Sequence, residues 1–166
     1  MRFYGEASTN WGQRLVVVAI CIVAPLLWPG PARPVEVKDD HLVAYDVVDG
    51  AIPKSLTGHP GVAAAGAHVA VDRSLGNCMS CHAVGQPKEE FPGNVGPDLA
   101  GVGSRLKEGE IRLRIVDPKR LNEATSMPAF YKVDGLDRVA KAYAGKPILT
   151  AEQVEDLVAY LMTLKN

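Results

Sequence analysis

The sequence predicts a mainly α-helical domain in which a few helices are separated by long loops. Three observations support this fold class: a capped amphipathic segment at the C-terminus, two shorter segments of helical composition, and intervening stretches rich in glycine and proline. A chain of 166 residues, 47% of them hydrophobic, is long enough for one domain with a buried core. Long loops are costly unless something in the interior organises them.

Residues 1–32 have the features of a secretory signal peptide. The uncharged apolar run LVVVAICIVAPLLW follows Arg2 and Arg14 and is too short to cross a hydrocarbon layer of about 30 Å as a helix. Small residues favour cleavage near Ala32, and an uncleaved membrane anchor is the alternative. We therefore expect an exported, periplasmic protein with no stable membrane span after cleavage.

The charge and the cysteine content of the expected mature chain limit the functions that the protein can have. Removal of the leader leaves 16 basic and 18 acidic residues, a net charge of −2, because two of 18 basic and one of 19 acidic residues are lost. This balance argues against nucleic acid as a partner. Cys21 leaves with the leader, so Cys78 and Cys81 remain, in a compartment that tolerates disulfides. We therefore look for the functional chemistry of the protein in these two cysteines.

Residues 33–60 are predicted to form an extended N-terminal strap ahead of the domain proper, residues 61–166. The strap is rich in valine, proline, aspartate and glycine, and its segment HLVAYDVV is half-alternating. Asp49-Gly50 is a turn signal, followed by Pro53.

Helices and loops alternate in the first half of the domain. The alanine-rich stretch 61–73 favours a helix, and Gly76-Asn77 opens a second helical turn through the cysteines. Residues 85–103 carry five glycines and three prolines and are expected to be mostly loop.

A helix is predicted over residues 107–117, where an apolar stripe ends at a proline. The stripe and the residue that ends it are Ile111, Ile115, Val116 and Pro118. Residues 118–149 are loop-like, apart from a short helical turn around residues 137–145.

The last helix, residues 150–165, is the clearest element. Thr150 is its N-cap and Gln153 stands three positions on, which is the spacing of a capping box. Its apolar residues recur on one face, which must pack against the core. They are Val154, Leu157, Val158, Leu161 and Leu164.

The run GNCMSCH contains a C-x-x-C-H pattern, which is typical of c-type haem attachment. Cys78 and Cys81 lie on one side of a single turn, so each thiol can add to one haem vinyl group. His82 then projects at the iron, and the covalent tether keeps it there when the oxidation state changes. The alternatives are a disulfide, a thioredoxin-like redox pair and half of a zinc site. A zinc site lacks further cysteine ligands, and no βαβ pattern of a redox protein surrounds the motif.

Met127 is the candidate for the second axial ligand. A thioether is the usual partner of histidine in electron-carrying cytochromes, and Met127 lies in a loop that Pro128 stiffens. Two alternatives remain open: Met127 is an ordinary buried loop methionine, or His59 or His68 is the distal ligand. The other methionines and His41 have no such context: Met1 is lost with the leader, Met79 lies between the cysteines, Met162 belongs to the last helix, and His41 is expected at the surface.

The segment NVGPDLAGVG is expected to support the haem. Pro97 would place its carbonyl near the ring N–H of His82, and Leu99 and Val102 would line the haem; an ordinary glycine/proline loop is the alternative. Six nearby cations are expected to form a docking face or, in the simpler interpretation, a solvated surface. They are Arg105, Lys107, Arg112, Arg114, Lys119 and Arg120.

Four stretches in this order resemble the SoxX family, the small monohaem cytochrome subunit of the SoxAX complex of bacterial sulfur oxidation. They are GNCMSCH, NVGPDLAGVGSR, IVDPKRLNEATSMPAFY and GKPILTAEQVEDLVAYLMTLK. The likeness runs from about Val43 to the C-terminus. It implies a class I cytochrome c fold with one covalent haem c, in which Cys78 and Cys81 are the attachment points, His82 the proximal ligand and Met127 the distal ligand.

The resemblance also implies a periplasmic heterodimer with a SoxA-like dihaem or monohaem subunit. In that family the complex, an L-cysteine S-thiosulfotransferase, joins thiosulfate oxidatively to a cysteine of the SoxYZ carrier. The sulfur chemistry occurs on SoxA, so this chain would have no catalytic residue and would pass electrons to a mobile cytochrome c. The main alternative is a free periplasmic monohaem carrier for another oxidase or dehydrogenase, and a non-redox ligand- or metal-binding module is the third.

Overall fold

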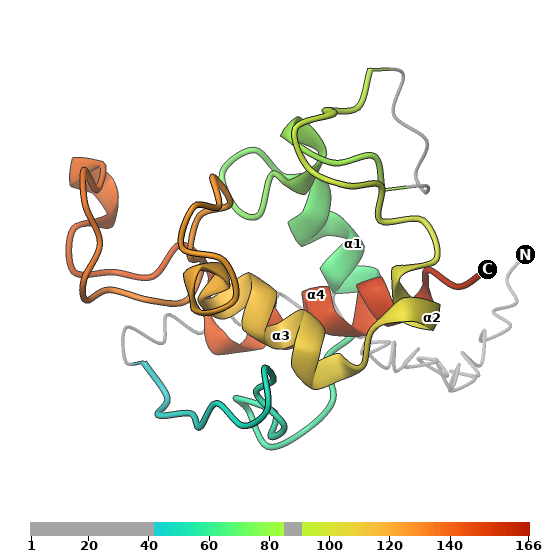
Figure 1. Ribbon diagram of the computed structural model, residues 1–166, viewed down its shortest axis with the longest axis horizontal. Helices are drawn as coiled ribbons and strands as arrows, with labels where there is room; N and C mark the ends of the chain where they lie inside the picture. The colour runs from blue at the N-terminus through green and yellow to red at the C-terminus, as the bar shows by residue number, and fades with distance from the viewer. Residues whose placement is uncertain (1–41, 85–90) are drawn as a thin grey trace, which may run out of the picture. The chain divides into compact units, whose positions relative to one another are not determined.

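The computed structural model describes residues 42–84 and 91–166, and Figure 1 shows how its helices are arranged. The expected signal peptide, residues 33–41 of the strap and His41 lie outside the described residues. No strand occurs in the described ranges; their elements are α1 (Ala63–Val71), η1 (Cys78–Ser80), α2 (Val102–Arg105), α3 (Glu108–Val116), η2 (Pro118–Arg120), η3 (Lys141–Tyr143) and α4 (Ala151–Thr163). The mainly α-helical fold class is therefore confirmed, and α2 is an addition at the end of a segment expected to be loop.

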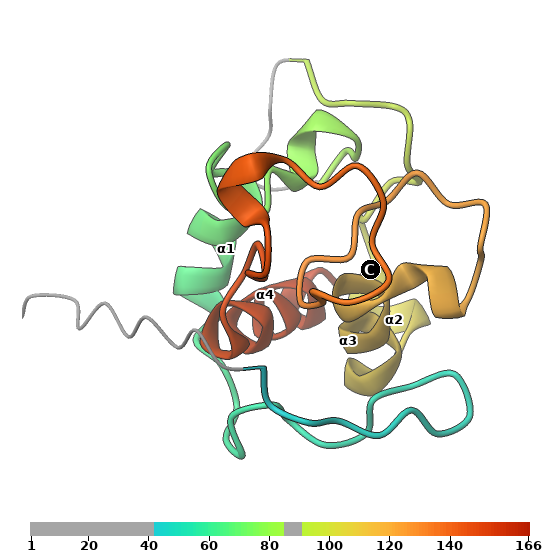
Figure 2. The same cartoon turned by 90° about the vertical axis from the view of Figure 1, so that its left-hand side faces the viewer.

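Helices α1 and α4 pack against each other at the centre of the fold, as both cartoon views show (Figures 1 and 2). Gly66 makes this close approach possible, because a Cβ atom there would lie 1.9 Å from the backbone oxygen of Asp156 and 2.8 Å from Cβ of Tyr160. The two backbones therefore touch with no side chain between them. Nothing in the local sequence marks this glycine as different from the other small residues of the helix.

Helix α4 begins with the expected capping box. The Thr150 hydroxyl accepts a hydrogen bond from the Gln153 backbone N–H at 3.2 Å, and the Gln153 side chain accepts one from the Thr150 N–H at 3.0 Å. Val154, Leu157, Val158 and Leu161 are buried and Leu164 packs against the core, so the predicted apolar face is confirmed. Glu155 and Asp156 are buried as well.

Helix α3 buries the predicted stripe of Ile111, Ile115 and Val116. The expectation that Arg112 lies at the surface was wrong, because its side chain is only 3% exposed. It forms a two-point ion pair with Glu155 of α4, with both nitrogen–oxygen distances at 2.8 Å. A third nitrogen donates to the Ile52 carbonyl at 2.7 Å. Such a pair persists in the interior because nearly all its hydrogen-bonding groups find partners.

The described part of the strap packs on α3 and α4 instead of projecting as a free arm (Figure 2). Asp49 and Gly50 form the predicted turn with φ of 49° and 73°, which closes the bridge between Val48 and Ala51. Beyond the turn, the Ile52 and Leu56 side chains are buried. The Leu56 N–H donates to Glu155 at 2.9 Å, so the buried ion pair also fixes the strap.

Candidate haem site

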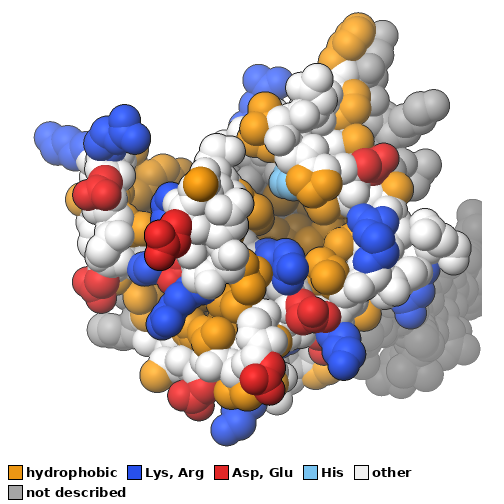
Figure 3. Space-filling model, viewed as in Figure 1, with side chains coloured by type: hydrophobic (Ala, Val, Ile, Leu, Met, Phe, Trp, Pro, Cys, Tyr) orange, Lys and Arg blue, Asp and Glu red, His pale blue; other side chains and the backbone are white. Residues whose placement is uncertain are grey.

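A large apolar cavity lies between the cysteine turn, helices α2, α3 and α4, and the loop that carries Met127. Its volume is about 720 Å³, which falls in the range of small-molecule and cofactor sites. Figure 3 shows the hollow, in which hydrophobic side chains predominate and a histidine lies near the rim. Ile115 of α3 and Leu157 and Leu161 of α4 form part of its floor.

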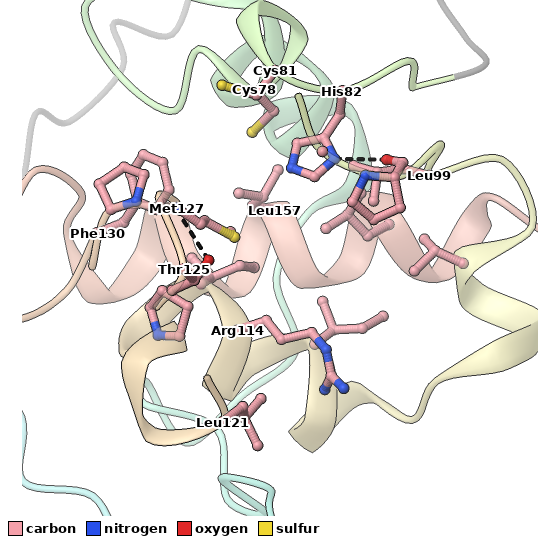
Figure 4. Close-up of a pocket in the computed structure, with 18 of the residues that line it drawn as sticks. Cys78, Cys81, His82, Leu99, Arg114, Leu121, Thr125, Met127, Phe130 and Leu157 are labelled. Atoms are coloured by element: carbon pink, nitrogen blue, oxygen red, sulfur yellow. Dashed lines mark hydrogen bonds between the residues drawn. The ribbon is translucent and has the colours of Figure 1, made fainter. Parts of the chain in front are cut away.

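The two cysteines line this cavity from the short turn η1. Asn77 precedes the turn with φ of 47°, and backbone N–H groups of Cys81 and His82 both donate to the Cys78 carbonyl, at 3.1 and 2.9 Å. This winding brings both thiols and the imidazole to the cavity (Figure 4). The cysteines are free and not joined in a disulfide.

The environment of Cys78 does not suit a thioredoxin-like redox pair. Burial raises the pKa of its thiol to about 11, since the thiolate would lose its hydration. A reactive redox cysteine needs a lowered pKa. Within the described ranges no group of three or more His, Cys, Asp or Glu side chains is placed to hold a metal ion, so the zinc alternative gains no support either.

The imidazole of His82 is held in one orientation by the loop after it. Nδ1 donates a hydrogen bond to the Pro97 carbonyl at 2.7 Å, so the other ring nitrogen is available to the cavity (Figure 4). Gly96 packs against the ring, because a Cβ there would lie 2.2 Å from Cε1 of His82. The loop is fixed by hydrogen bonds from the Gly96 N–H to the Cys81 carbonyl and from the Leu99 N–H to the Ala83 carbonyl, both at 2.8 Å.

Met127 reaches the same cavity from the loop after α3. Figure 4 shows its thioether and the His82 imidazole both pointing into the cavity, from different walls. The Met127 backbone N–H donates to the Thr125 hydroxyl at 3.2 Å, which fixes the turn just before it. Met127 itself is half-buried.

Several of the expected site residues line the cavity, whereas the competing residues in the described part of the chain do not. Pro97, Leu99 and Val102 line the cavity as expected. His59 and His68 are exposed and are not among the lining residues. Among the remaining methionines, Met79 is buried in the core and Met162 packs against it, and neither lines this cavity.

Two of the six cations expected at the surface contribute to the cavity wall. Arg105 donates to the backbone carbonyls of Asp98, at 3.0 Å, and of Ala100, and Arg114 donates to the Glu110 carbonyl at 2.8 Å. Lys107, Lys119 and Arg120 are exposed, as the solvated-surface interpretation predicts. The sequence reasoning also missed the lining residues Leu121, Phe130 and Leu157, whose apolar character alone does not distinguish a cofactor wall from ordinary core.

The residues present fit a covalently bound haem. The cavity is large and apolar, two thiols lie on one short turn at its edge, and an oriented imidazole and a thioether both point into it. Soft and nitrogen donors of this kind are the axial ligands of electron-transfer haems. Because the histidine is held by a backbone carbonyl, its free nitrogen is already aimed before any ligand binds.

Comparison with known proteins agrees with this geometry. Residues 63–165 match the family model described as "Cytochrome c". The crystal structure of SoxXA from P. pantotrophus contains a chain that is 44% identical, with a TM-score of 0.68; the match covers 74% of the present chain and 95% of that chain. The c-type cytochrome SorU from Sinorhizobium meliloti is 23% identical with a TM-score of 0.41, over 62% of this chain and 90% of its own. A search of curated proteins gave no match.

Proposed function

Because this chain belongs to the cytochrome c family and, within it, to the SoxX group, we propose that it is the monohaem electron-transfer subunit of a SoxXA-type complex of sulfur oxidation. One observation carries the proposal: the 44% identity to a chain of SoxXA extends over 95% of that chain and 74% of this one. Identity at this level over a whole chain supports a shared role as well as a shared fold.

In this proposal four side chains hold the cofactor. Cys78 and Cys81 form the thioether bonds, His82 is the proximal ligand and Met127 the distal ligand. When bound, haem c supplies a one-electron redox couple. The Pro97 carbonyl orients His82 and increases its basicity, while the thioether of Met127 favours the reduced state and raises the potential. If His82 and Met127 both bound the iron, they would leave no coordination position for dioxygen or small substrates.

The apolar walls contribute to the same role. Leu99, Ile115 and Leu157 line the cavity and keep water away from the site, so that little solvent reorganises when the charge of the site changes. The described residues contain no cysteine beyond the two haem tethers. That supports a division of labour in which the partner carries the sulfur chemistry and this chain accepts electrons.

We further infer the partners and location of the chain. A SoxA-like dihaem or monohaem cytochrome is the subunit that binds it, and the complex acts as an L-cysteine S-thiosulfotransferase on the SoxYZ carrier. Electrons released when thiosulfate is joined to the carrier cysteine pass through this haem to a mobile cytochrome c. The domain limits of 1–32, 33–60 and 61–166 and the periplasmic location remain proposals. None of the helices in the described residues has the length and apolar character needed to cross a bilayer.

The test is co-expression of this chain with the SoxA-like protein of the same organism, followed by affinity purification through the partner. The expected result is a stable complex containing a c-type haem on this chain, with an intact mass equal to a chain beginning near Arg33 plus one haem. Addition of thiosulfate and SoxYZ should reduce this haem, whereas thiosulfate alone should not.

A His82→Ala variant is the control for the haem signal, since it should retain the partner but change the haem spectrum. Recovery of monomer only would favour the free periplasmic carrier. A mature chain whose mass lacks a prosthetic group would exclude both the subunit and the free-carrier hypotheses. It would favour the third hypothesis, a non-redox ligand- or metal-binding module.

A further inference from the structure

Residues 118–131, here called the methionine loop, form one whole wall of the haem cavity. Eight residues of this loop line the cavity, from Pro118 at its start to Phe130 near its end, and Met127 is one of them. The loop contains only one short helical element, η2. Hydrogen bonds such as that from Lys119 Nζ to the Glu123 carbonyl, at 2.9 Å, hold it internally, and its position relative to the cavity depends on how its two ends are held. A displaced loop would carry Met127 away from the cavity.

The two residues that flank the methionine loop are joined by an ion pair in which the carboxylate is buried and the lysine is partly exposed. Lys132 Nζ donates to Asp117 Oδ2 at 2.7 Å, which closes the loop at its base. The Asp117 side chain is 4% exposed and that of Lys132 is 29% exposed. One backbone hydrogen bond, from the Phe130 N–H to the Ile115 carbonyl at 3.0 Å, lies beside the pair.

Two other groups, Arg120 and Tyr45, lie near Asp117 but do not replace Lys132 in closing the base of the loop. Arg120 Nε is 3.8 Å from Oδ2, but its side chain is 64% exposed, which makes that contact weak. Tyr45 of the strap lies near enough that Asp117 helps raise the pKa of its phenol, after burial as the larger cause. Lys132 is therefore the close cationic partner of Asp117 in the described part of the chain.

Stability alone does not account for a carboxylate at this position. Asp117 Oδ1 is buried and has no hydrogen-bond partner among the described residues. Burying a charged group with an unsatisfied oxygen is costly, and well-packed apolar residues often serve stability better than a buried ion pair. What such a pair provides is a specific geometry, here a fixed distance between the two ends of the loop.

We propose that Asp117 and Lys132 are positioning residues that hold Met127 in place as the distal ligand, by clasping the base of the methionine loop. The inference rests on the proposed function, because it requires Met127 to bind the iron. Neither residue touches the cavity, so their effect is exerted through the loop.

The experiment uses the ferric haem protein and measures how readily Met127 leaves the iron. Binding of cyanide requires the sixth position to open, so its rate reports that opening. Lys132→Gln and Asp117→Asn are expected to speed cyanide binding by about tenfold, since each removes a charge-assisted hydrogen bond. Lys132→Arg restores the cation and should stay close to wild type. Lys146→Gln, which removes an exposed lysine outside the clasp, is the matched control.

A second measurement separates positioning from general stability. The near-infrared sulfur-to-iron band and the helical circular dichroism are followed in guanidinium. In the clasp variants the band should disappear at a lower denaturant concentration than the helices, and the reduction potential should fall. The double variant Asp117→Asn/Lys132→Gln leaves no unpaired buried charge, so it provides the same test should Lys132→Gln fail to fold.

The outcomes distinguish a wrong assignment of Met127 from a wrong role for Asp117 and Lys132. If the wild-type protein lacks the sulfur-to-iron band, the Met127 assignment fails and this inference fails with it. If the wild type has the band but Asp117→Asn and the double variant bind cyanide at the wild-type rate, or if band and helices are lost together in them, the clasp is refuted while the haem site stands.

Discussion

Gly96 provides the sharpest test of how the loop after the cysteine turn holds His82. In the Gly96→Ala variant the new methyl group would lie 2.2 Å from Cε1, 2.5 Å from Nδ1 and 2.7 Å from Nε2 of His82. Its φ is not positive, so the backbone would tolerate alanine and only the imidazole stands in the way. Either the ring or the loop must therefore retreat by about 1 Å to reach ordinary van der Waals contact.

The expected cost follows from the contacts that this movement disturbs. Overpacking of a fixed neighbour costs about 1–3 kcal/mol. Weakening the 2.7 Å hydrogen bond between His82 and the Pro97 carbonyl adds about 0.5–1.5 kcal/mol. We expect the free energy of unfolding of the haem protein to fall by about 1.5–4.5 kcal/mol. The reduction potential should rise, because an imidazole without its carbonyl partner is less basic and favours ferric iron less.

Guanidinium unfolding and potentiometry of the haem protein measure both quantities. Gly145→Ala is the matched control, since its φ of 71° makes alanine strained there although nothing lies within 4 Å. That strain costs about 1–2 kcal/mol and should leave the potential unchanged. A Gly96→Ala protein with wild-type stability and potential would refute the packing of Gly96 on the imidazole.

Three further changes test the rest of the structure. Met127→Ala is expected to abolish the near-infrared sulfur-to-iron band of the ferric protein and to lower the potential, and an unchanged band would move the distal ligand to another residue. Glu155→Gln should lower the free energy of unfolding by about 3–5 kcal/mol, because it leaves Arg112 buried without its partner; the double variant Arg112→Leu/Glu155→Leu should cost less, and equal costs would argue against an uncompensated charge. Without haem attachment, in Cys78→Ala/Cys81→Ala, the chain should lose its cooperative fold by circular dichroism. The apolar wall of the cavity, about 720 Å³ in volume, would then be left exposed to water, and a domain has only roughly 5–15 kcal/mol of stability to set against that loss; a cooperatively unfolding haem-free protein would contradict this.

The haem motif and the last helix were predictable because their signals are local. A C-x-x-C-H run specifies its chemistry within five residues, and the capping box and apolar stripe of α4 depend only on spacings of three and four residues. The Asp49-Gly50 turn is of the same kind. The carbonyl of Pro97 was expected near the His82 ring from the segment NVGPDLAGVG, and the structure has it at 2.7 Å.

Residues whose role depends on a distant partner were not predictable in this way. Arg112 sits in a helix among other charged residues, and only the fold places it beside Glu155 and the Ile52 carbonyl, 43 and 60 positions away. Nothing in the alanine-rich sequence around Gly66 indicates a need for glycine, and only the close packing of α4 against α1 explains it.

The sequence by itself predicted which atoms can bind a haem and which segments are helical, since both predictions rest on short-range patterns. The tertiary structure decided which face each helix buries, which cations leave the surface, and how the methionine loop is closed at Asp117 and Lys132. The reason is physical: burial and charge pairing depend on distances between atoms brought together by folding, and these distances are not encoded in any local spacing.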